Sequence, residues 1–316
     1  TKKDLTTGLE FKHLVDNMSW NLSADYRVNS SFMQADWLPR FDHYWLGASP
    51  LSNILTYNEH THVGYARLHD AALPTDPTDA AKFSLLQGEV NNEGLLAATR
   101  QEIDLPFELG PVKFVPYLMG EAAYWGEDIN GDPLTRLYGQ GGVRTSMPIW
   151  RADQGVQSEL FNLNGLAHKI TLDGDLYYAD ANKNYQQLPQ YDQVDDDAIE
   201  QFRRRLLFNT YGLTAASFVP TQFDPRNFAL RSGLQSSVTS PVTEVADDLA
   251  VARLGARQRW QTKRGMPGNE RIVDWIVLDA HASVFLDPTR DNYGQTLGLI
   301  DYDFRWHLGD RFTLLS

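Results

Sequence analysis

The stretch from Thr296 to Leu308 (TLGLIDYDFRWHL) most constrains what this chain can fold into, because two kinds of side chain alternate along it. From Gly298 onward the even-numbered positions are glycine or apolar, and from Asp301 onward the odd-numbered positions carry Asp, Asp, Arg and His. A β-strand sends successive side chains to opposite faces, so the stretch predicts a strand with one apolar and one charged face. Such a strand fits a soluble sheet, with its apolar face in a core, or a transmembrane barrel, with that face in lipid.

The composition excludes several classes of protein. The chain has 316 residues and a formal net charge of −13, and this acidic balance argues against a nucleic-acid-binding surface. It has no cysteine, which excludes a disulfide framework and a zinc–thiolate cluster. No run approaches the roughly 18 consecutive apolar residues of a membrane-spanning helix. Aromatic residues reach 12%, and the many Trp and Tyr side chains are typical of membrane interfaces and ligand grooves.

Alternation with a period of two residues recurs along most of the chain and predicts strands joined mainly by short turns. The clearest turns are Asp16-Asn17 and Asn130-Gly131, and a further turn is expected at 91–94. There is no alternation of strands with helices, so the pattern predicts an antiparallel, all-β chain with on the order of a dozen strands. The strand candidates are 8–15, 19–29, 37–51, 55–69, 100–109, 112–126, 135–150, 167–180, 250–263, 271–286 and 296–308.

One segment departs from this pattern. Between Asp195 and Tyr211, acidic residues precede apolar residues at helical spacing and arginines follow, which predicts one short helix. The stretch 214–249 is long and irregular, and a connection of this length is usually functional. We therefore expect residues 1–316 to form a single β-barrel segment with a helix-containing loop insertion at about 183–249. The chain begins at Thr1 without a Met or a signal peptide, so we expect a fragment of a larger protein.

Three features favour a transmembrane barrel over a soluble sandwich. Several strand candidates are roughly 11–16 residues long, against the usual 5–6 or so. Their apolar faces consist mainly of Leu, Ile, Ala, Tyr and Trp, with aromatic residues towards the strand ends, as in a girdle. Their polar faces carry charges of both signs, as at Arg253 and Arg257 beside Asp301, which a lumen can hydrate and a sandwich interior cannot. Alternation alone also fits a soluble β-solenoid or an orthogonal barrel.

Two groups of side chains invite a chemical interpretation. His60 and His62 share one strand face, with His69 at the end of that segment, but no cysteine or acidic third ligand follows at a matching spacing. We interpret them as imidazoles that face the lumen. Asp301 and Asp303 resemble the carboxylate pair of a glycosidase, yet on one strand beside an arginine they are more typical of a charged face.

The remaining motifs carry no catalytic signature. There is no G-x-S-x-G elbow, and Gly139 to Gly142 (GQGG) lacks the Lys and Ser/Thr of a phosphate-binding loop. The arginines at 203–205 form a solvated helix face or meet an anionic partner. The basic face from Arg253 to Lys263 either balances lumen charge or cradles the phosphates of an anionic glycolipid. We therefore predict no catalytic residue, no cofactor-binding residue and no metal ligand.

Several segments carry a family resemblance. They are similar to strands of the C-terminal barrel of the lipopolysaccharide-assembly outer-membrane protein family, LptD (also called OstA), and to its planctomycete-type members in particular. Their motifs are structural strand signatures and not a catalytic fingerprint. The segments are 224–230 (DPRNFAL), 253–265 (RLGARQRWQTKRG), 271–275 (RIVDW) and 301–311 (DYDFRWHLGDR), with agreement at 38–46 (LPRFDHYWL), 65–67, 100–116, 144–148 (RTSMP) and 157–168 (QSELFNLNGLAH).

This resemblance implies a partial, many-stranded transmembrane β-barrel in the outer membrane of a Gram-negative cell. Such a barrel receives lipopolysaccharide from periplasmic bridge proteins and releases it through a lateral opening into the outer leaflet. A plug lipoprotein normally sits in the lumen, and a remote ATPase supplies energy. The chain departs from the family in three ways: the periplasmic β-jellyroll domain is absent, the strand count is too low for the complete barrel, and the cysteines that some members pair are missing. No lumen or gate residue matches a family motif, so none is assigned.

The sequence therefore predicts a lipopolysaccharide or related glycolipid export translocon in the cell outer membrane, in contact with outer-membrane lipids and without enzymatic activity, cofactor or nucleic-acid partner. A passive outer-membrane porin or channel is the first alternative. A soluble all-β carbohydrate-binding protein or glycoside hydrolase is the second.

Overall fold

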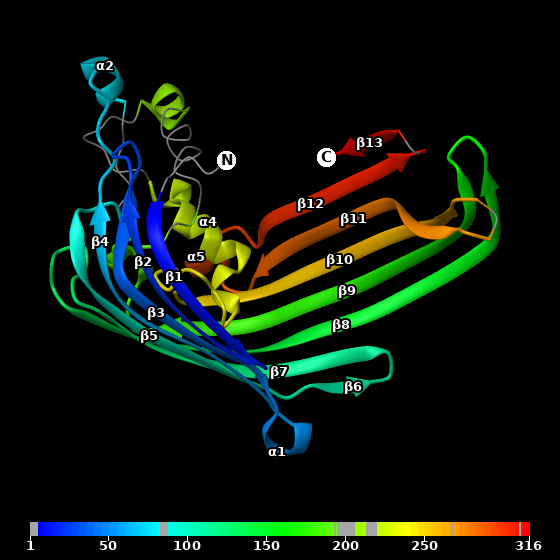
Figure 1. Ribbon diagram of the computed structural model, residues 1–316, viewed down its shortest axis with the longest axis horizontal. Helices are drawn as coiled ribbons and strands as arrows, with labels where there is room; N and C mark the ends of the chain where they lie inside the picture. The colour runs from blue at the N-terminus through cyan, green and yellow to red at the C-terminus, as the bar shows by residue number, and fades with distance from the viewer. Residues whose placement is uncertain are drawn as a thin grey trace. The chain divides into compact units, whose positions relative to one another are not determined.

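The computed structural model describes residues 6–82, 88–192, 194, 206–212, 220–266, 268–309 and 311–316. Thirteen strands form one antiparallel sheet (Figure 1). Its order is β1-β2-β3-β4-β5-β7-β8-β9-β10-β11-β12-β13, with β6 paired to β7 beside this path. The strands are β1 (Thr6–Val15), β2 (Met18–Arg27), β3 (Gln34–Ala48), β4 (Thr56–His69), β5 (Asn92–Asp104), β6 (Phe107–Leu109), β7 (Val112–Trp125), β8 (Leu134–Ser158), β9 (Leu163–Ala181), β10 (Leu249–Arg264), β11 (Arg271–Phe285), β12 (Leu297–Leu308) and β13 (Phe312–Leu315).

The predicted antiparallel, all-β fold is confirmed, and closure into a barrel is not detected within the described residues. One predicted turn and one predicted strand were wrong in detail. Residues 91–94 do not form a turn, because Asn92 begins β5 and its neighbours pair in register with β4 as far as Leu68. The predicted strand 100–109 is interrupted, since Pro106 has no backbone N–H to donate to a neighbouring strand.

Helices are short and lie in the connections. Residues 206–211 of the predicted helix are helical, and residues 195–205 lie outside the described part of the chain. A helix also forms in the stretch predicted to be irregular, where Asp224 accepts a hydrogen bond from the Arg226 N–H and Gly233 ends the helix at a φ of 93°. No helix among the described residues is both long and apolar enough to cross a membrane. The helices are α1 (Pro50–Asn53), α2 (Pro77–Ala80), α4 (Pro225–Ser232) and α5 (Pro288–Asp291), with 3₁₀ turns η1 (Tyr185–Gln187), η2 (Thr221–Phe223) and η3 (Leu234–Ser236).

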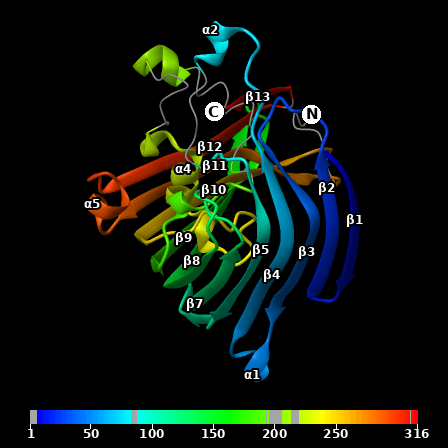
Figure 2. The same cartoon turned by 90° about the vertical axis from the view of Figure 1, so that its left-hand side faces the viewer.

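The chain forms two compact units, which are described separately. Unit 1 comprises residues 1–104, 118–140 and 179–248, and unit 2 comprises residues 105–117, 141–178 and 249–316. In unit 1, strands β1 to β5 lie side by side in one sheet (Figure 2). The connection from Tyr185 to Asp248, here called the covering segment, belongs to the same unit.

The two faces of the unit 1 sheet have the opposite polarity from those of a soluble protein. On β5, β7 and β8, the exposed face carries leucines that are 42%, 71% and 58% exposed; these are Leu95, Leu118 and Leu137. On the other face of the same strands, ionisable side chains are buried beneath the covering segment, with exposed fractions of 4%, 6% and 0%; these are Arg100, Glu121 and Arg136. A soluble sheet would bury the leucines and expose the charges, whereas on these strands the exposed face is the apolar one.

The covered face of unit 1 also contains an apolar half. There, side chains from the strands pack beneath Leu188 and Tyr191 of the covering segment, and the Tyr191 ring meets the Trp37 ring edge-on at 6.0 Å. Burial of this cluster fixes one end of the covering segment on the sheet by the hydrophobic effect. The strand residues of the cluster include Trp37, Ala66, Leu68, Leu96, Ala98, Ala123, Trp125 and Leu134.

A row of polar side chains crosses the apolar face of unit 1 at β3, β4 and β5. The His43 Nδ1 and Glu59 Oε2 atoms lie 2.7 Å apart, and the hydroxyls of Thr61 and Thr99 share a hydrogen bond of 2.7 Å. The strand register places His43, Thr61 and Thr99 in one row. These side chains satisfy one another, so the interruption leaves few polar atoms in need of water.

Strand pairing in unit 2 brings the apolar residues of three strands onto one face. Leu254 pairs with Ala282, which pairs with Ile300; Ala280 lies between Ala256 and Tyr302 in the next row. Tyr302, Phe304 and Trp306 therefore share one face of the sheet with Leu254, Ala256 and Ile276. Leu254 and Tyr302 are 56% and 60% exposed, so no second layer of protein covers this face within the described residues.

Replacing Leu254 by Arg tests whether this face meets lipid. In lipid vesicles we expect the substitution to lower the free energy of unfolding by about 2–4 kcal/mol, the cost of a guanidinium on the lipid face of a barrel. Leu286→Arg is the matched control, because Leu286 is 60% exposed but follows the end of β11. It should change the free energy by no more than about 0.5 kcal/mol. Equal small effects in urea titrations of both variants would contradict a lipid-facing surface.

Candidate functional site

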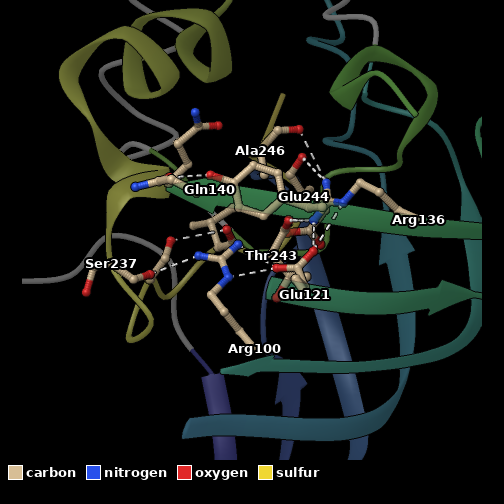
Figure 3. Close-up of polar contacts among 12 residues, drawn as sticks. Arg100, Glu121, Arg136, Gln140, Ser237, Thr243, Glu244 and Ala246 are labelled. Carbon is tan, nitrogen blue, oxygen red and sulfur yellow. Dashed lines mark hydrogen bonds and ion pairs between the residues drawn. The ribbon is translucent and has the colours of Figure 1, made fainter. Parts of the chain in front are cut away.

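The covered face of unit 1 centres on one carboxylate shared by two guanidinium groups. The strand order places Arg100 on β5, Glu121 on β7 and Arg136 on β8 on neighbouring strands. Glu121 accepts from Arg100 Nε at 2.8 Å with one oxygen and from Arg136 Nε at 3.2 Å with the other, and both Nη2 groups also donate to it (Figure 3). Three charged side chains are thus held in water-free surroundings by one another.

The spare donors of this triad bind the backbone of the covering segment. Arg100 Nη1 donates to the Ser237 carbonyl at 2.9 Å, and Arg136 Nη2 donates to the Thr243 carbonyl at 2.5 Å (Figure 3). Arg136 Nη1 lies 3.4 Å from the Glu244 carbonyl oxygen. One carboxylate cannot neutralise two cations, so the carbonyl dipoles take up the remaining positive charge. The triad therefore both closes the interior of the sheet and anchors the covering segment.

A second anchor joins β3 to the covering segment. Arg40 Nε donates to Asp42 on its own strand at 2.9 Å, and Arg40 Nη1 donates to Asp192 of the covering segment at 2.8 Å. The guanidinium lies 4.6 Å from the centroid of the Trp37 ring, which holds it by a cation–π contact. A planar fork that bridges two carboxylates positions both of them.

A third arginine organises the covering segment itself. Arg226 in α4 is fully buried and pairs with Asp224, the residue that caps the same helix, at 3.1 Å. Its Nη1 donates to the carbonyl oxygens of Leu188 at 3.0 Å and Tyr185 at 3.3 Å. One side chain thus ties α4 to the start of the covering segment.

Three carboxyl groups of the covering segment have raised pKa values because they are partly or fully buried. Burial, and then the nearby charge of Asp192, raises the pKa of Glu244 to about 8, and burial raises the pKa of Asp247 to about 6. Burial also raises the pKa of Asp192 despite its pairing with Arg40. One Glu244 oxygen accepts from the Tyr191 N–H at 3.2 Å, and the other has no hydrogen-bond partner. Glu244 is therefore held mainly as the neutral acid at pH 7.

The structure brings together histidines that the sequence analysis singled out. His60 and His62 lie on the covered face with ring centroids 5.1 Å apart, and both are buried. Strand pairing supplies an acidic neighbour that the sequence spacing did not predict. Asp42 on β3 lies opposite His62 on β4. His69 does not join them; its Nε2 lies 2.9 Å from Asp36. Only the register of two strands could have revealed this group.

The charged face of unit 2 consists of separate ion pairs. Asp301 lies 3.1 Å from the His281 ring and Asp303 lies 2.5 Å from Arg305, so each carboxylate has a separate partner. This agrees with the interpretation of the two aspartates as part of a charged face. The GQGG stretch lies within β8 and forms no loop, and residues 203–205 lie outside the described part of the chain. Two further pairs are Arg257–Asp173 at 2.8 Å and Arg259–Asp279 at 2.6 Å.

A cavity of about 440 Å³ opens on the same charged face. It is lined from five neighbouring strands. Three of its side chains are cationic, namely Lys113, Arg144 and Arg253, and two are acidic, namely Asp173 and Asp175. The Arg144 guanidinium lies 3.7 Å from the centroid of the Tyr117 ring, and Arg253 Nε is buried without a hydrogen-bond partner. With three cationic side chains against two carboxylates, the lining keeps an excess of positive charge, which suits a phosphate or carboxylate group because arginine and lysine recognise both.

Comparisons with known proteins assign no family to the chain. No family model matches it, and no curated protein matches it. A solved chain of the FpvAI–pyocin S2 complex is weakly similar, with 12% sequence identity and a TM-score of 0.18. The similarity covers 99% of this chain and 37% of that chain, so this chain spans little more than a third of it. A likeness at this level carries no argument about function.

Replacing Glu121 by Gln should strongly destabilise unit 1. The substitution leaves two buried guanidinium groups without a counter-charge, and breaking a buried pair in this way costs about 3–5 kcal/mol. Asp173→Asn is the matched control, because it removes the half-exposed Arg257 pair, which contributes about 0–1 kcal/mol. Chemical denaturation in detergent micelles measures both variants, and similar losses would show that the triad is not the main anchor.

Replacing Glu244 by Gln should change how stability depends on pH. In wild type the folded-state pKa of Glu244, about 8, lies above the ordinary value of 4.5 for a glutamic acid side chain. The associated stability is fully present below pH 4.5 and is lost as the pH rises through 8. Hydrogen exchange of the covering segment should therefore speed up over this range in wild type more than in Glu244→Gln. Glu159→Gln, in the exposed turn after β8, should behave like wild type; an equal pH response in all three proteins would contradict the raised pKa.

Proposed function

We propose that this chain is part of an outer-membrane β-barrel that exports lipopolysaccharide or a related glycolipid. The observation that carries the proposal is the polarity of the sheet, with exposed leucines such as Leu118 on one face and buried ionisable groups such as Arg136 on the other. A transmembrane barrel wall has this polarity, since its outer face meets hydrocarbon and its inner face meets polar groups. The family resemblance of the strand segments supports the same function.

A glycolipid is the cargo that best matches the two faces of unit 2, of which one is charged and the other is apolar. Its sugar and phosphate groups are polar and anionic, whereas its acyl chains need an apolar path. In unit 2, the cavity beside Lys113, Arg144 and Arg253 offers cationic groups to the anionic head, and the face bearing Leu254 offers an apolar surface. Transport of this kind needs no reaction at a covalent bond, so we propose a translocon without enzymatic activity.

The covering segment distinguishes this proposal from a passive channel. Its described residues pack on the covered face of unit 1 through Arg100, Arg136 and the apolar cluster, so these side chains are removed from solvent where a passive channel would expose them. The charged face of unit 2 carries no such cover within the described residues, so we propose it as the surface that meets the plug lipoprotein. Periplasmic bridge proteins would deliver the glycolipid to the same barrel.

Depletion of the full-length protein in its host tests this function. We expect glycolipid at the cell surface to fall several-fold, and expression of wild type to restore it. The double variant Arg144→Gln/Arg253→Gln should restore surface glycolipid poorly, because it removes two cationic groups from the cavity. Arg305→Gln, on the same face but outside the cavity, is the control and should restore it fully. Unchanged surface glycolipid together with lower uptake of small solutes would instead support a passive channel.

A further inference from the structure

A group of three metal-ligating side chains lies on the covered face of unit 1, apart from the cavity of unit 2. Asp42, His60 and His62 are 5%, 4% and 3% exposed, so all three are almost fully removed from solvent. Each offers one ligand atom, and these atoms all lie within 4.8 Å of one another. Exposed histidines and carboxylates often lie close together by chance. Burying three such side chains costs free energy unless they are paired or bind a ligand.

The group is built on rigid elements. Asp42 lies in β3 and the two histidines lie in β4, where the register pairs Asp42 with His62. His60 Nε2 and Asp42 Oδ1 are 3.1 Å apart. Two ligand atoms of a tetrahedral zinc ion with bonds of about 2.0 Å lie about 3.3 Å apart. The observed separation therefore already fits two ligands of one ion.

Each of the three side chains is oriented by a neighbour outside the group. Arg40 Nε donates to Asp42 Oδ2 at 2.9 Å and Arg40 Nη2 donates to Oδ1 at 3.2 Å, and the Tyr44 ring stacks on the His60 ring at 4.1 Å. The hydroxyl of Thr243 lies 3.1 Å from His62 Nε2. Metal sites typically have such outer contacts, which fix the tautomer and the direction of each ligand.

His62 carries the observation that points to a ligand. Its Nδ1 atom is buried and has no hydrogen-bond partner, although the ring is only 3% exposed. When Nε2 carries the proton and donates it to Thr243, Nδ1 presents an unused lone pair. A buried polar atom without a partner is destabilising, and a bound cation would satisfy this one.

We propose that Asp42, His60 and His62 bind one divalent transition-metal ion of the zinc class. Two imidazole nitrogens and one carboxylate oxygen suit such an ion, and calcium or magnesium would require more oxygen ligands. The ion takes the place of the hydrogen bond between His60 Nε2 and Asp42, so His60 binds it with the proton on Nδ1. The proposal revises the expectation of no metal ligand and does not depend on the proposed export function.

Bound metal would lock the two strands beneath the covering segment. The ion joins β3 to β4, and Thr243 then rests on a ligand whose position is fixed. The ion would thereby connect Asp42 to Thr243 through His62. Thr243 is also the residue whose carbonyl oxygen accepts a hydrogen bond from Arg136. Metal removal should consequently loosen the covering segment as well as the hairpin of β3 and β4.

The test uses the purified full-length protein, stripped with a chelator and then titrated with Zn²⁺. We expect one equivalent to bind per chain, and Co²⁺ in its place should give the visible absorption bands of a tetrahedral site. His60→Ala and His62→Ala should each weaken binding at least about 100-fold, and Thr243→Val about 10–100-fold. His13→Ala, which removes an exposed imidazole from β1, should bind as wild type does.

Folding of each variant is checked by its strand content in circular dichroism, and His62→Gln replaces His62→Ala if the latter does not fold. Loss of hydrogen-exchange protection in the covering segment on metal removal would further support the proposal. The proposal is overturned if wild type retains no Zn²⁺ after removal of excess metal, or if the His60 and His62 variants bind Zn²⁺ as tightly as wild type.

Discussion

The interior of unit 1 depends on the carboxylate of Glu121. Arg100 and Arg136 reach it from the strands on either side, and neither guanidinium could remain away from water without it. Because the two cations exceed the single anion, they also require the carbonyl oxygens of the covering segment. Sheet and covering segment are therefore held by one electrostatic arrangement, and the neighbouring apolar cluster around Trp125 closes the same face.

The same arrangement explains the surface of the sheet. Strand geometry gives each residue only two directions, so strands that bury arginine and glutamate on one side must present their alternate residues on the other. In β7, Leu118 and Glu121 therefore point to different faces of the sheet, and in β8 so do Leu137 and Arg136. Burial of charge and exposure of leucine are thus two results of a single alternating pattern.

The alternating pattern made most strands and both faces of β12 predictable from sequence, because period-2 order depends only on near neighbours. Residues 91–94 were missed, since turn-type residues accept a strand conformation when a neighbouring strand satisfies their backbone. The approach of Asp42 to His62 was missed because it depends on strand register. The contact of Arg136 with Thr243, 107 residues away, is encoded by no local pattern, and neither is the fold of the covering segment.

The arginines that anchor the covering segment in unit 1 donate hydrogen bonds to main-chain carbonyl oxygens. Arg100 holds the carbonyl of Ser237, and Arg136 holds the carbonyl of Thr243. A carbonyl group is present whatever side chain its residue carries. Many side chains of the covering segment can therefore be substituted during evolution while its hydrogen bonds to the sheet are kept. Substitution of the strand arginines would remove those hydrogen bonds. Sequence variation should accordingly concentrate in the segment and spare the residues that hold it.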